Sequence, residues 1–406
     1  MFDETCKQKQ ELFGQQPGQQ PRQLPRQCGA LYVHVPFCRA KCRYCDFYSL
    51  GIQQAPAGRY VQALARELAL HQHHLARPAD TIFVGGGTPT AIGCELLGQL
   101  LAAIAPLAGT KTEFSVEANP GTIDQAILKT MIGSGVNRIN LGVQSLDDGE
   151  LAGIGRIHDA AMAIAAVEMV QRAGLANVGL DLIYGLPGQT LHSWQTSLAR
   201  ALNMGVAHLS CYALSFEPGT PLWQDLQDGK VVEMDESLQK ECYYAAIAAA
   251  QSAGLVHYEI SNFAAPQRQC RHNLTYWHNR SYLGLGPAAA SYIDAVRRVN
   301  NADLQAYLAA IESGGTPPFQ QEHLAGRRLM AETAMLALRL TAGLDRREFA
   351  DRFGADITAV FPKSIARYTA IGALELTQTH LRIAGDFLFV ADTVLADIIA
   401  EAGGPI

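Results

Sequence analysis

Residues 31–45 read LYVHVPFCRAKCRYC. The first five residues form a short apolar run rich in β-formers, and a loop with three cysteines, Cys38, Cys42 and Cys45, follows it directly. A strand that ends in a loop of reactive side chains is typical of α/β folds whose sites lie at the carboxyl ends of parallel strands. The same pattern, a short strand followed by a polar or glycine-rich loop, recurs downstream and decides the predicted fold.

Short β-rich runs alternate with longer helical stretches over the first three quarters of the chain. The predicted strands are 31–35, 81–84, 113–117, 138–143, 178–183 and 208–214. The predicted helices are 59–75, 95–107, 124–132, 147–173, 191–204 and 238–253. Successive βα units predict parallel strands joined by right-handed crossovers. We therefore expect an α/β fold, a partial (βα)6 TIM-like barrel, with an open wound sheet as the alternative.

The chain divides into three predicted parts. Residues 1–29 are rich in Gln and Pro and are predicted to be a flexible tail. Residues 30–300 carry the barrel. Residues 301–406 lose the βα rhythm and predict a helical, winged-helix-like domain. Its predicted helices are 304–312, 325–338, 346–353 and 357–368, and its predicted hairpin strands are 374–381 and 387–391.

Composition excludes several classes of protein. The 406 residues include 32 basic and 38 acidic side chains, a net charge of −6 that argues against a nucleic-acid partner. No apolar run reaches the about 20 residues of a membrane-spanning helix, and the acidic start lacks the apolar stretch of a secretory signal. Nine cysteines, an odd number, argue against a disulfide framework. We expect a cytoplasmic protein.

The three-cysteine loop has the spacing of a metal or redox site. Three thiolates can hold three irons of a [4Fe–4S] cluster and leave the fourth iron open to a substrate or cofactor, whereas ordinary ferredoxin sites supply four cysteines. Arg39, Lys41 and Arg43 are expected to lower the thiol pKa values. A zinc knuckle, which needs a fourth ligand that the loop does not supply, and unliganded thiols are the alternatives.

With an aromatic residue before its last cysteine, this loop resembles the signature of radical S-adenosylmethionine (SAM) enzymes. Residues 32–38, YVHVPFC, and residues 85–90, GGGTPT, resemble the oxygen-independent coproporphyrinogen III oxidase group. Residues 272–277, HNLTYW, are similar to the H-N-x-x-Y-W signature of the HemW heme chaperones within that group. The resemblance covers residues 30–400 and implies a radical SAM barrel.

The resemblance also implies residues that hold SAM. Gly86, Gly87 and Thr88 would meet the methionine amino group, since glycine backbone allows close approach. The other implied SAM-site residues are Tyr32, Tyr44, Glu117, Gln144, Arg156, Asp181 and Ala213. Charged and amide side chains of this kind pair with the carboxylate, ammonium and hydroxyl groups of such a cofactor. A plain glycine turn, surface ion pairs and helix caps are the alternatives.

A heme site is implied by the H-N-x-x-Y-W segment, which is predicted to be a loop after the barrel. His272 would be an axial iron ligand, and Tyr276 and Trp277 would offer aromatic surface to the macrocycle. A hydrogen-bonded structural role for His272 is the alternative.

The function implied is that of a heme chaperone, which binds heme and passes it to apo-hemoproteins and carries a SAM-ligated [4Fe–4S] cluster. This function is compatible with acceptors of respiratory type, with peripheral contact with membrane proteins and with a homodimer. The alternative is an oxygen-independent coproporphyrinogen III oxidase-like enzyme. Oxidases of the group carry a further cysteine where Phe47 stands here, so this decarboxylation is not expected and enzymatic activity is left open. A general redox ferredoxin is disfavoured by the open iron.

Overall fold

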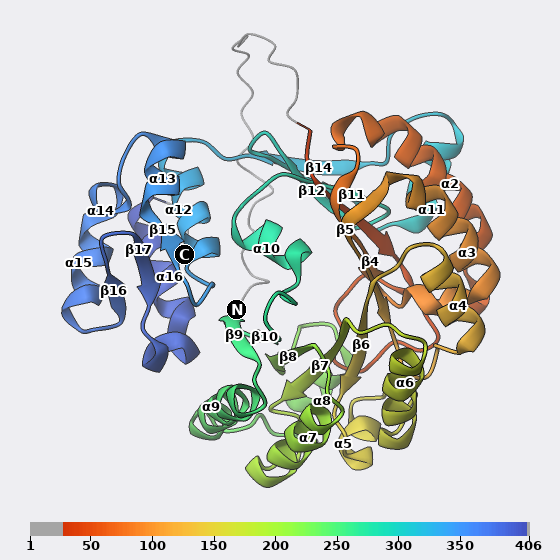
Figure 1. Ribbon diagram of the computed structural model, residues 1–406, viewed down its shortest axis with the longest axis horizontal. Coiled ribbons are helices and arrows are strands. Elements are labelled where there is room, and N and C mark those ends of the chain that lie inside the picture. The colour runs from red at the N-terminus through yellow and green to blue at the C-terminus, as the bar shows by residue number, and fades with distance from the viewer. Residues whose placement is uncertain (1–26, 404–406) are drawn as a thin grey trace.

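The computed structural model describes residues 27–403 (Figure 1), so most of the predicted tail lies outside the described residues. Its main feature is a sheet with the strand order β14-β13-β12-β11-β1-β4-β5-β6-β7-β8-β10-β9. The central six strands are parallel. They are β1 (Ala30–Val35), β4 (Ala79–Gly86), β5 (Ala108–Ala118), β6 (Arg138–Gln144), β7 (Val178–Tyr184) and β8 (His208–Ala213). Each predicted strand overlaps one of them, and the partial (βα)6 barrel is confirmed.

The connecting helices cover the outer side of this sheet, as Figure 1 shows. They are α2 (Ala57–His71), α3 (Gly93–Ile104), α4 (Gln125–Gly133), α6 (Ala160–Arg172), α7 (Leu191–Asn203) and α9 (Glu236–Ser252). Strand β6 shows why the sheet has two different faces: Ile139, Leu141 and Val143 are fully buried in the core, and polar residues alternate with them. Because side chains along a strand point to opposite faces, the second face is left to polar side chains.

The predicted helix over residues 147–173 is wrong in one respect, because it is two helices. The first, α5 (Asp148–Gly153), ends before Gly155, and α6 begins only at Ala160. Gly155 has a φ of +72°, a left-handed conformation that a helix cannot contain. The break matters because the resulting loop carries Arg156.

The sheet is wider than predicted. At one end β10 (Asn262–Ala264) pairs antiparallel with β8, and β9 (Val256–Glu259) follows it. At the other end β11 (Tyr282–Leu285) runs parallel to β1. Three antiparallel strands complete that end: β12 (Ala290–Ile293), β13 (Val296–Asn300) and β14 (Phe319–His323). These strands are short, and the sequence gives them little periodicity.

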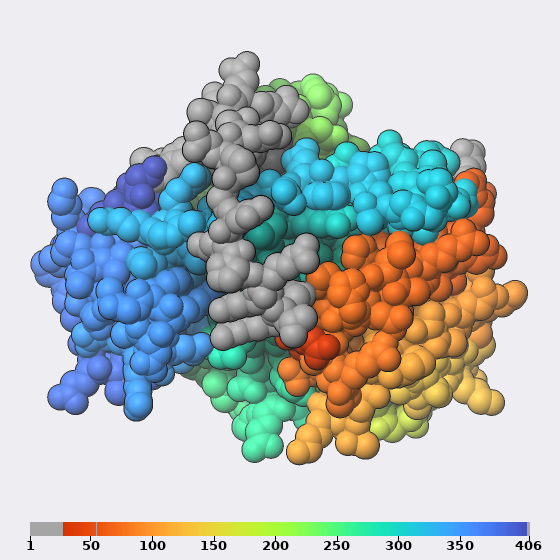
Figure 2. All heavy atoms as spheres, turned by 90° about the horizontal axis from the view of Figure 1, so that it is seen from above, coloured from red at the N-terminus to blue at the C-terminus, as the bar shows by residue number. Residues whose placement is uncertain are grey.

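The C-terminal part is largely helical, with α12 (Gly326–Ala337), α13 (Arg346–Phe353) and α16 (Ala391–Glu401) as its longer helices besides α15. The predicted helix 357–368 is interrupted at Pro362 and forms α14 (Ile357–Val360) and α15 (Pro362–Ala370), because proline cannot continue a helix from its interior. The helix α11 (Leu304–Glu312) lies beside α2, as Figures 1 and 2 show. Arg59 of α2 forms an ion pair with Glu312 of α11.

The predicted hairpin is partly wrong. The pair is β16 (Leu374–Leu376) with β17 (His380–Ile383), joined by β15 (Leu344–Asp345) in a small sheet. Residues 387–391 belong instead to a 3-10 turn, η6 (Gly385–Val390), and to the start of α16. Three successive side chains there, Phe387, Leu388 and Phe389, all contact the core, which a helical turn allows and an alternating strand does not.

One segment, Pro89–Leu107, is long and apolar enough to cross a membrane by length and composition. It comprises α3 and the 3-10 turns on either side of it. Leu97, Leu100 and Leu101 of α3 are buried in the core of the barrel. The apolar character of this segment is therefore that of a core helix.

Candidate functional site

The three cysteines lie at the carboxyl end of β1. Cys38 is in the short strand β2 (Phe37–Cys38), which pairs with β3 (Leu50–Gly51) and so closes the loop between them. The amide of Cys45 donates to the carbonyl of Cys42 over 3.3 Å. All three cysteines are half-buried and none is in a disulfide. The pairing of β2 with β3 and the turn between Cys42 and Cys45 therefore order the backbone of the loop.

Two neighbouring segments hold this loop in place. The amide of Arg43 donates to the carbonyl of Ile154 (3.0 Å), and the amide of Leu222 donates to the carbonyl of Arg43 (2.9 Å). Leu222 belongs to α8 (Pro221–Gln227), and Asp225 of the same helix forms an ion pair with the Arg43 guanidinium. Tyr44 packs on a small apolar cluster that comprises Ile154, Ile183, Leu186, Leu214 and Leu222.

The cation that contacts a thiol is not one of those predicted. Arg156 Nη1 lies 3.2 Å from Cys42 Sγ, and its Nη2 donates to the carbonyl of Gly142. Arg43 is engaged by Asp225, and Arg39 donates to the carbonyl of Gly121. Of the loop's own basic residues, Lys41 lowers the pKa of the Cys45 thiol as expected, but this effect is outweighed. Burial raises the pKa of Cys45 to about 11, with further increases from the neighbouring thiols.

The donor set does not match a single metal ion. Within residues 27–403 no three His, Cys, Asp or Glu side chains come close enough together to hold one ion. A structural zinc site has four ligands around one centre, and the loop supplies three cysteines. An iron–sulfur cube places each thiolate on a different iron, and the loop offers three cysteines that are in no disulfide. Since ligation needs thiolates, assembly of a metal centre here would displace protons from buried thiols.

The glycines at the end of β4 allow the cysteine loop to pack against that strand. The Gly87 amide donates to the Val35 carbonyl (2.9 Å), and the Thr88 amide donates to the Phe37 carbonyl (2.7 Å). A Cβ on Gly87 would lie 2.6 Å from the Phe37 carbonyl oxygen. Gly86 has a φ of +106°, and a Cβ there would lie 2.6 Å from the His34 ring. Thr88 Oγ1 is 3.6 Å from Cys38 Sγ.

Two carboxylates face the same mouth. Burial and the charge of Asp181 raise the pKa of Glu117 to about 8, although the Gly86 amide donates to Glu117 Oε2 over 3.2 Å. Burial also raises the pKa of Asp181, whose Oδ2 accepts from Asn140 at 2.5 Å. Asp181 Oδ1 is buried without a hydrogen-bond partner among the described residues. An unsatisfied carboxylate oxygen of this kind fits a ligand that brings an ammonium or hydroxyl donor.

The remaining predicted SAM-site residues lie at the same end of the strands or beside it. Gln144 ends β6 at a register shift against β7 and has a φ of +71°, and this bulged backbone re-aims its side chain. Ala213 ends β8 and is exposed. Tyr32, inside β1, shares a 3.0 Å hydrogen bond with His34 Nδ1, a histidine that sequence reasoning missed.

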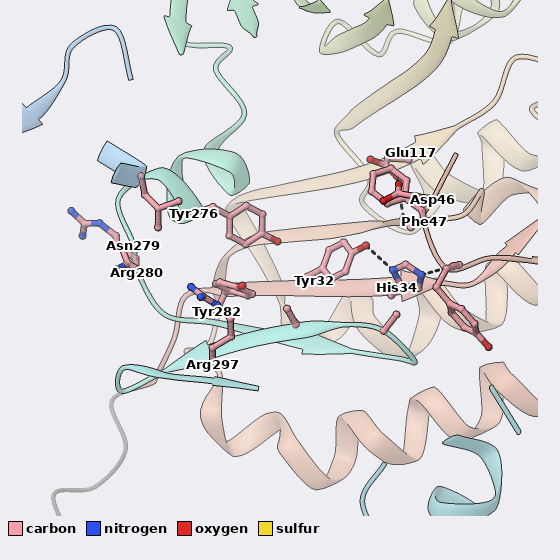
Figure 3. Close-up of a pocket in the computed structure, with 15 residues that line it drawn as sticks. Tyr32, His34, Asp46, Phe47, Glu117, Tyr276, Asn279, Arg280, Tyr282 and Arg297 are labelled. Carbon is pink, nitrogen blue, oxygen red and sulfur yellow. Dashed lines mark hydrogen bonds between the residues drawn. The ribbon is translucent and has the colours of Figure 1, made fainter. Parts of the chain in front are cut away.

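A cavity of about 510 Å³ extends from this mouth along β1 (Figure 3). Asp46, Phe47 and Glu117 line one end of it. At the other end it is lined by Tyr276, Asn279, Arg280, Tyr282 and Arg297. Phe47 is 63% exposed. The cavity thus joins an acidic end near the cysteine loop to an aromatic and basic end.

The segment 271–277 was predicted as a loop and is a short helix, α10 (Arg271–Trp277). Figure 1 shows α10 between the two ends of the sheet. Glu113 of β5 accepts hydrogen bonds from the amides of Arg271 and His272, each 3.1 Å long. These first amides of the helix have no partner within it, so a carboxylate distant in sequence stabilises the helical start.

His272 is enclosed rather than open to a ligand. It is 1% exposed, and its Nδ1 and Nε2 share 2.8 Å hydrogen bonds with Thr81 Oγ1 and Tyr276 Oη, respectively. Burial lowers its pKa to about 3. Coordination of iron would require one of these bonds to break, so the contacts match the structural alternative. Trp277 lies under the Arg339 guanidinium, 5.4 Å from its carbon, and does not line the cavity.

Comparisons with known proteins identify relatives with the same fold. Residues 32–201 match the model of the radical SAM superfamily, and residues 324–384 match that of the HemN C-terminal domain. The coproporphyrinogen III oxidase HemN from Escherichia coli has a similar structure, with a TM-score of 0.80 at 20% identity over 92% of this chain and 90% of that chain. The fold and the three-cysteine loop define a radical SAM protein.

Sequence identity to several heme chaperones is higher than the 20% identity to HemN. The heme chaperone HemW of Bacillus subtilis is 33% identical over 91% of this chain and 99% of its own length. The heme chaperone HemW of Synechocystis is 39% identical over 78% of this chain and 79% of its own length. The chain belongs to the HemW family of heme chaperones.

Proposed function

We propose that this protein binds heme and transfers it to apo-hemoproteins, and that it carries a [4Fe–4S] cluster with bound SAM. The observation that carries the proposal is the similarity to a protein named as a heme chaperone along 99% of that protein's length. The buried polar groups at the barrel mouth support the cofactor part of the proposal, because such groups are normally satisfied by a partner.

In this proposal the cluster is held by Cys38, Cys42 and Cys45, and one iron is left for SAM. Arg156, already 3.2 Å from a cysteine sulfur, offsets negative charge at the cluster. The residues proposed to surround SAM are Tyr32, Tyr44, Gly86, Gly87, Thr88, Glu117, Gln144, Asp181 and Ala213. When reduced, a cluster of this type would supply the electron for cleavage of the sulfonium bond of SAM.

Heme is proposed to bind near α10. Tyr276 presents its ring to the cavity, which has aromatic and basic side chains that suit a flat ring with carboxylate substituents. The roles of His272 and Trp277 toward heme stay predictions. We further propose that the acceptors are apo-hemoproteins of the cytoplasm or of the membrane periphery, that the protein is cytoplasmic, and that residues 30–300 and 301–406 act as two domains.

Phe47 argues against an oxidase. It is the residue two positions beyond the last cysteine of the loop, it is largely exposed, and it lines the cavity. An apolar ring there supplies no thiol for porphyrinogen chemistry. The two functions are separated by anaerobic incubation with reductant, SAM and coproporphyrinogen III. We expect no turnover to protoporphyrinogen, and multiple turnovers would refute the chaperone proposal.

The direct test is anaerobic reconstitution with iron and sulfide followed by titration with heme. We expect a cluster in the wild type and none when Cys38, Cys42 and Cys45 are all replaced by Ser. We also expect one saturable heme site per chain and transfer of the bound heme to an apo-hemoprotein. A reconstituted wild type without an iron–sulfur centre, or without saturable heme binding, would refute the proposal.

A further inference from the structure

Several polar atoms inside the barrel lack a hydrogen-bond partner. Within residues 27–403, the buried side-chain atoms of this kind include Ser115 Oγ, Asn140 Oδ1, Asp181 Oδ1 and His208 Nδ1. These four residues lie on the neighbouring strands β5, β6, β7 and β8 (Figure 1). Buried polar atoms are normally satisfied by protein groups or by ordered water. Unsatisfied atoms gathered in one region therefore indicate that water or a ligand is bound there.

The register of three strands places Asn140 and His208 on either side of a glycine. Gly179 of β7 is the partner of Asn140 on β6 and of His208 on β8. A Cβ on Gly179 would collide with Asn140 Oδ1 and would lie 3.4 Å from His208 Nδ1. Both unpartnered atoms thus adjoin the notch that the missing side chain leaves, and one water can reach both. The notch is deep in the protein, since Asn140 is 9% exposed and His208 is 1% exposed.

The contacts beyond His208 set the direction in which its ring donates. The Cys270 amide donates to Tyr258 Oη over 3.4 Å, and Tyr258 Oη lies 2.8 Å from His208 Nε2. With the amide as its donor, the Tyr258 hydroxyl can donate in turn to Nε2, which leaves the proton of a neutral imidazole on Nδ1. Burial and then the charge of Arg138 lower the pKa of His208, so the ring is neutral. Its Nδ1–H is then a donor beside the notch.

We propose that an ordered water fills the notch over Gly179, where it accepts from His208 Nδ1 and donates to Asn140 Oδ1. The chain through this water makes Asn140 and His208 positioning residues for the carboxyl group of Asp181. Asn140 Nδ2 donates to Asp181 Oδ2 over 2.5 Å, so an amide held at both ends occupies that oxygen and leaves Oδ1 open to a ligand. This inference rests on the proposed function, because Asp181 is one of the residues proposed to surround SAM.

A crystal structure of the full-length protein that resolves ordered water tests the first part of the inference. We expect a water within about 3.2 Å of both Asn140 Oδ1 and His208 Nδ1. An empty notch, or a direct hydrogen bond between the two side chains, would overturn the inference. This result is independent of the proposed function, because the notch lies inside the barrel whether or not SAM is bound.

The positioning role is tested by the affinity of anaerobically reconstituted protein for SAM, with the iron and sulfide content of each variant measured as well. His208→Leu removes both hydrogen bonds of the ring, whereas His208→Gln can accept from Tyr258 and donate to the water. We expect SAM to bind at least about fivefold more weakly to His208→Leu than to the wild type, and His208→Gln to restore most of the affinity. A role in packing alone would not favour glutamine over leucine.

Filling the notch is an independent perturbation. Gly179 lies within β7 and is not among the left-handed glycines, so alanine suits its backbone. The new Cβ would displace the water and push away the Asn140 amide. We expect Gly179→Ala to bind SAM at least about tenfold more weakly than the wild type. Gly133→Ala is the matched control, because a Cβ there has no atom within 4 Å, and it should keep the wild-type affinity.

The outcomes separate the inference from the proposed function. A reconstituted wild type that binds no SAM refutes the SAM part of the proposed function, and the crystal structure still decides whether the notch holds a water. If the wild type binds SAM, cluster-loaded His208→Leu or Gly179→Ala with unchanged affinity overturns the positioning role and leaves the function standing. If neither variant folds, Tyr258→Phe decides the matter: weaker SAM binding supports the chain, and unchanged binding overturns it.

Discussion

Replacement of Glu113 by alanine tests whether a carboxylate distant in the sequence stabilises the start of α10. Glu113 is buried, and its oxygens accept from the amides of Arg271 and His272. The change leaves the buried amide of His272 and the partly buried amide of Arg271 without an acceptor, and each loss costs about 1–3 kcal/mol. We therefore expect local stability at the start of α10 to fall by about 3 kcal/mol. Glu113→Gln keeps one acceptor oxygen and is expected to lose about half as much.

Hydrogen exchange measures this loss where it occurs. A loss of about 3 kcal/mol corresponds to roughly a hundredfold faster exchange, since about 1.4 kcal/mol is a factor of ten. Peptides that contain residues 271–277 should show this acceleration in Glu113→Ala, and a smaller one in Glu113→Gln. Peptides from α3 serve as the internal control. Exchange of the α10 amides within threefold of the wild type would show that Glu113 does not hold this helix.

Other predictions concern the barrel mouth. Gly87→Ala should destabilise the protein by about 2 kcal/mol in urea denaturation, because its new Cβ would lie 2.6 Å from the Phe37 carbonyl oxygen; an unchanged midpoint would contradict this. The raised pKa of Glu117, about 8 against 4.5 for the ordinary group, means that the folded state holds a proton that the unfolded state releases. Stability should therefore fall as the pH rises from about 4.5 to about 8. In melting curves of the apo-protein, Glu117→Gln should flatten this pH dependence. The same dependence of melting temperature on pH in the variant and the wild type would argue against a buried carboxyl. Arg156→Ala should lower the iron and sulfide bound per chain after reconstitution, because it removes the cation next to Cys42; full occupancy would exclude this role.

Much of the site was predictable because it follows the strands. Glu117 ends a predicted strand, Gly86 and Gln144 follow closely after two others, and parallel strands bring their carboxyl ends to one edge. The structure places all three at the mouth beside the cysteine loop. Arg156 was assigned to this site by resemblance, and the structure adds how it arrives there. A left-handed Gly155 breaks the expected helix and frees the residue that follows.

Other features left no usable signal in the sequence. His34 is one polar residue in an apolar strand, and only the structure shows its ring between Tyr32 and the Tyr48 carbonyl. The strands β9 to β13 have only three to five residues each. Runs this short do not establish a period of two, and their pairing depends on the edges that β1 and β8 present.

The class of fold and the location of the cysteine loop could be predicted from local patterns, because the alternation of β-rich and helical segments and the spacing of the cysteines are properties of neighbouring residues. That His272 is enclosed, by contrast, becomes evident only once the chain is folded. His272 is held by Thr81, 191 residues away, and by Glu113, 159 residues away. Contacts at such separations form only after the strands have assembled, so no local pattern records them.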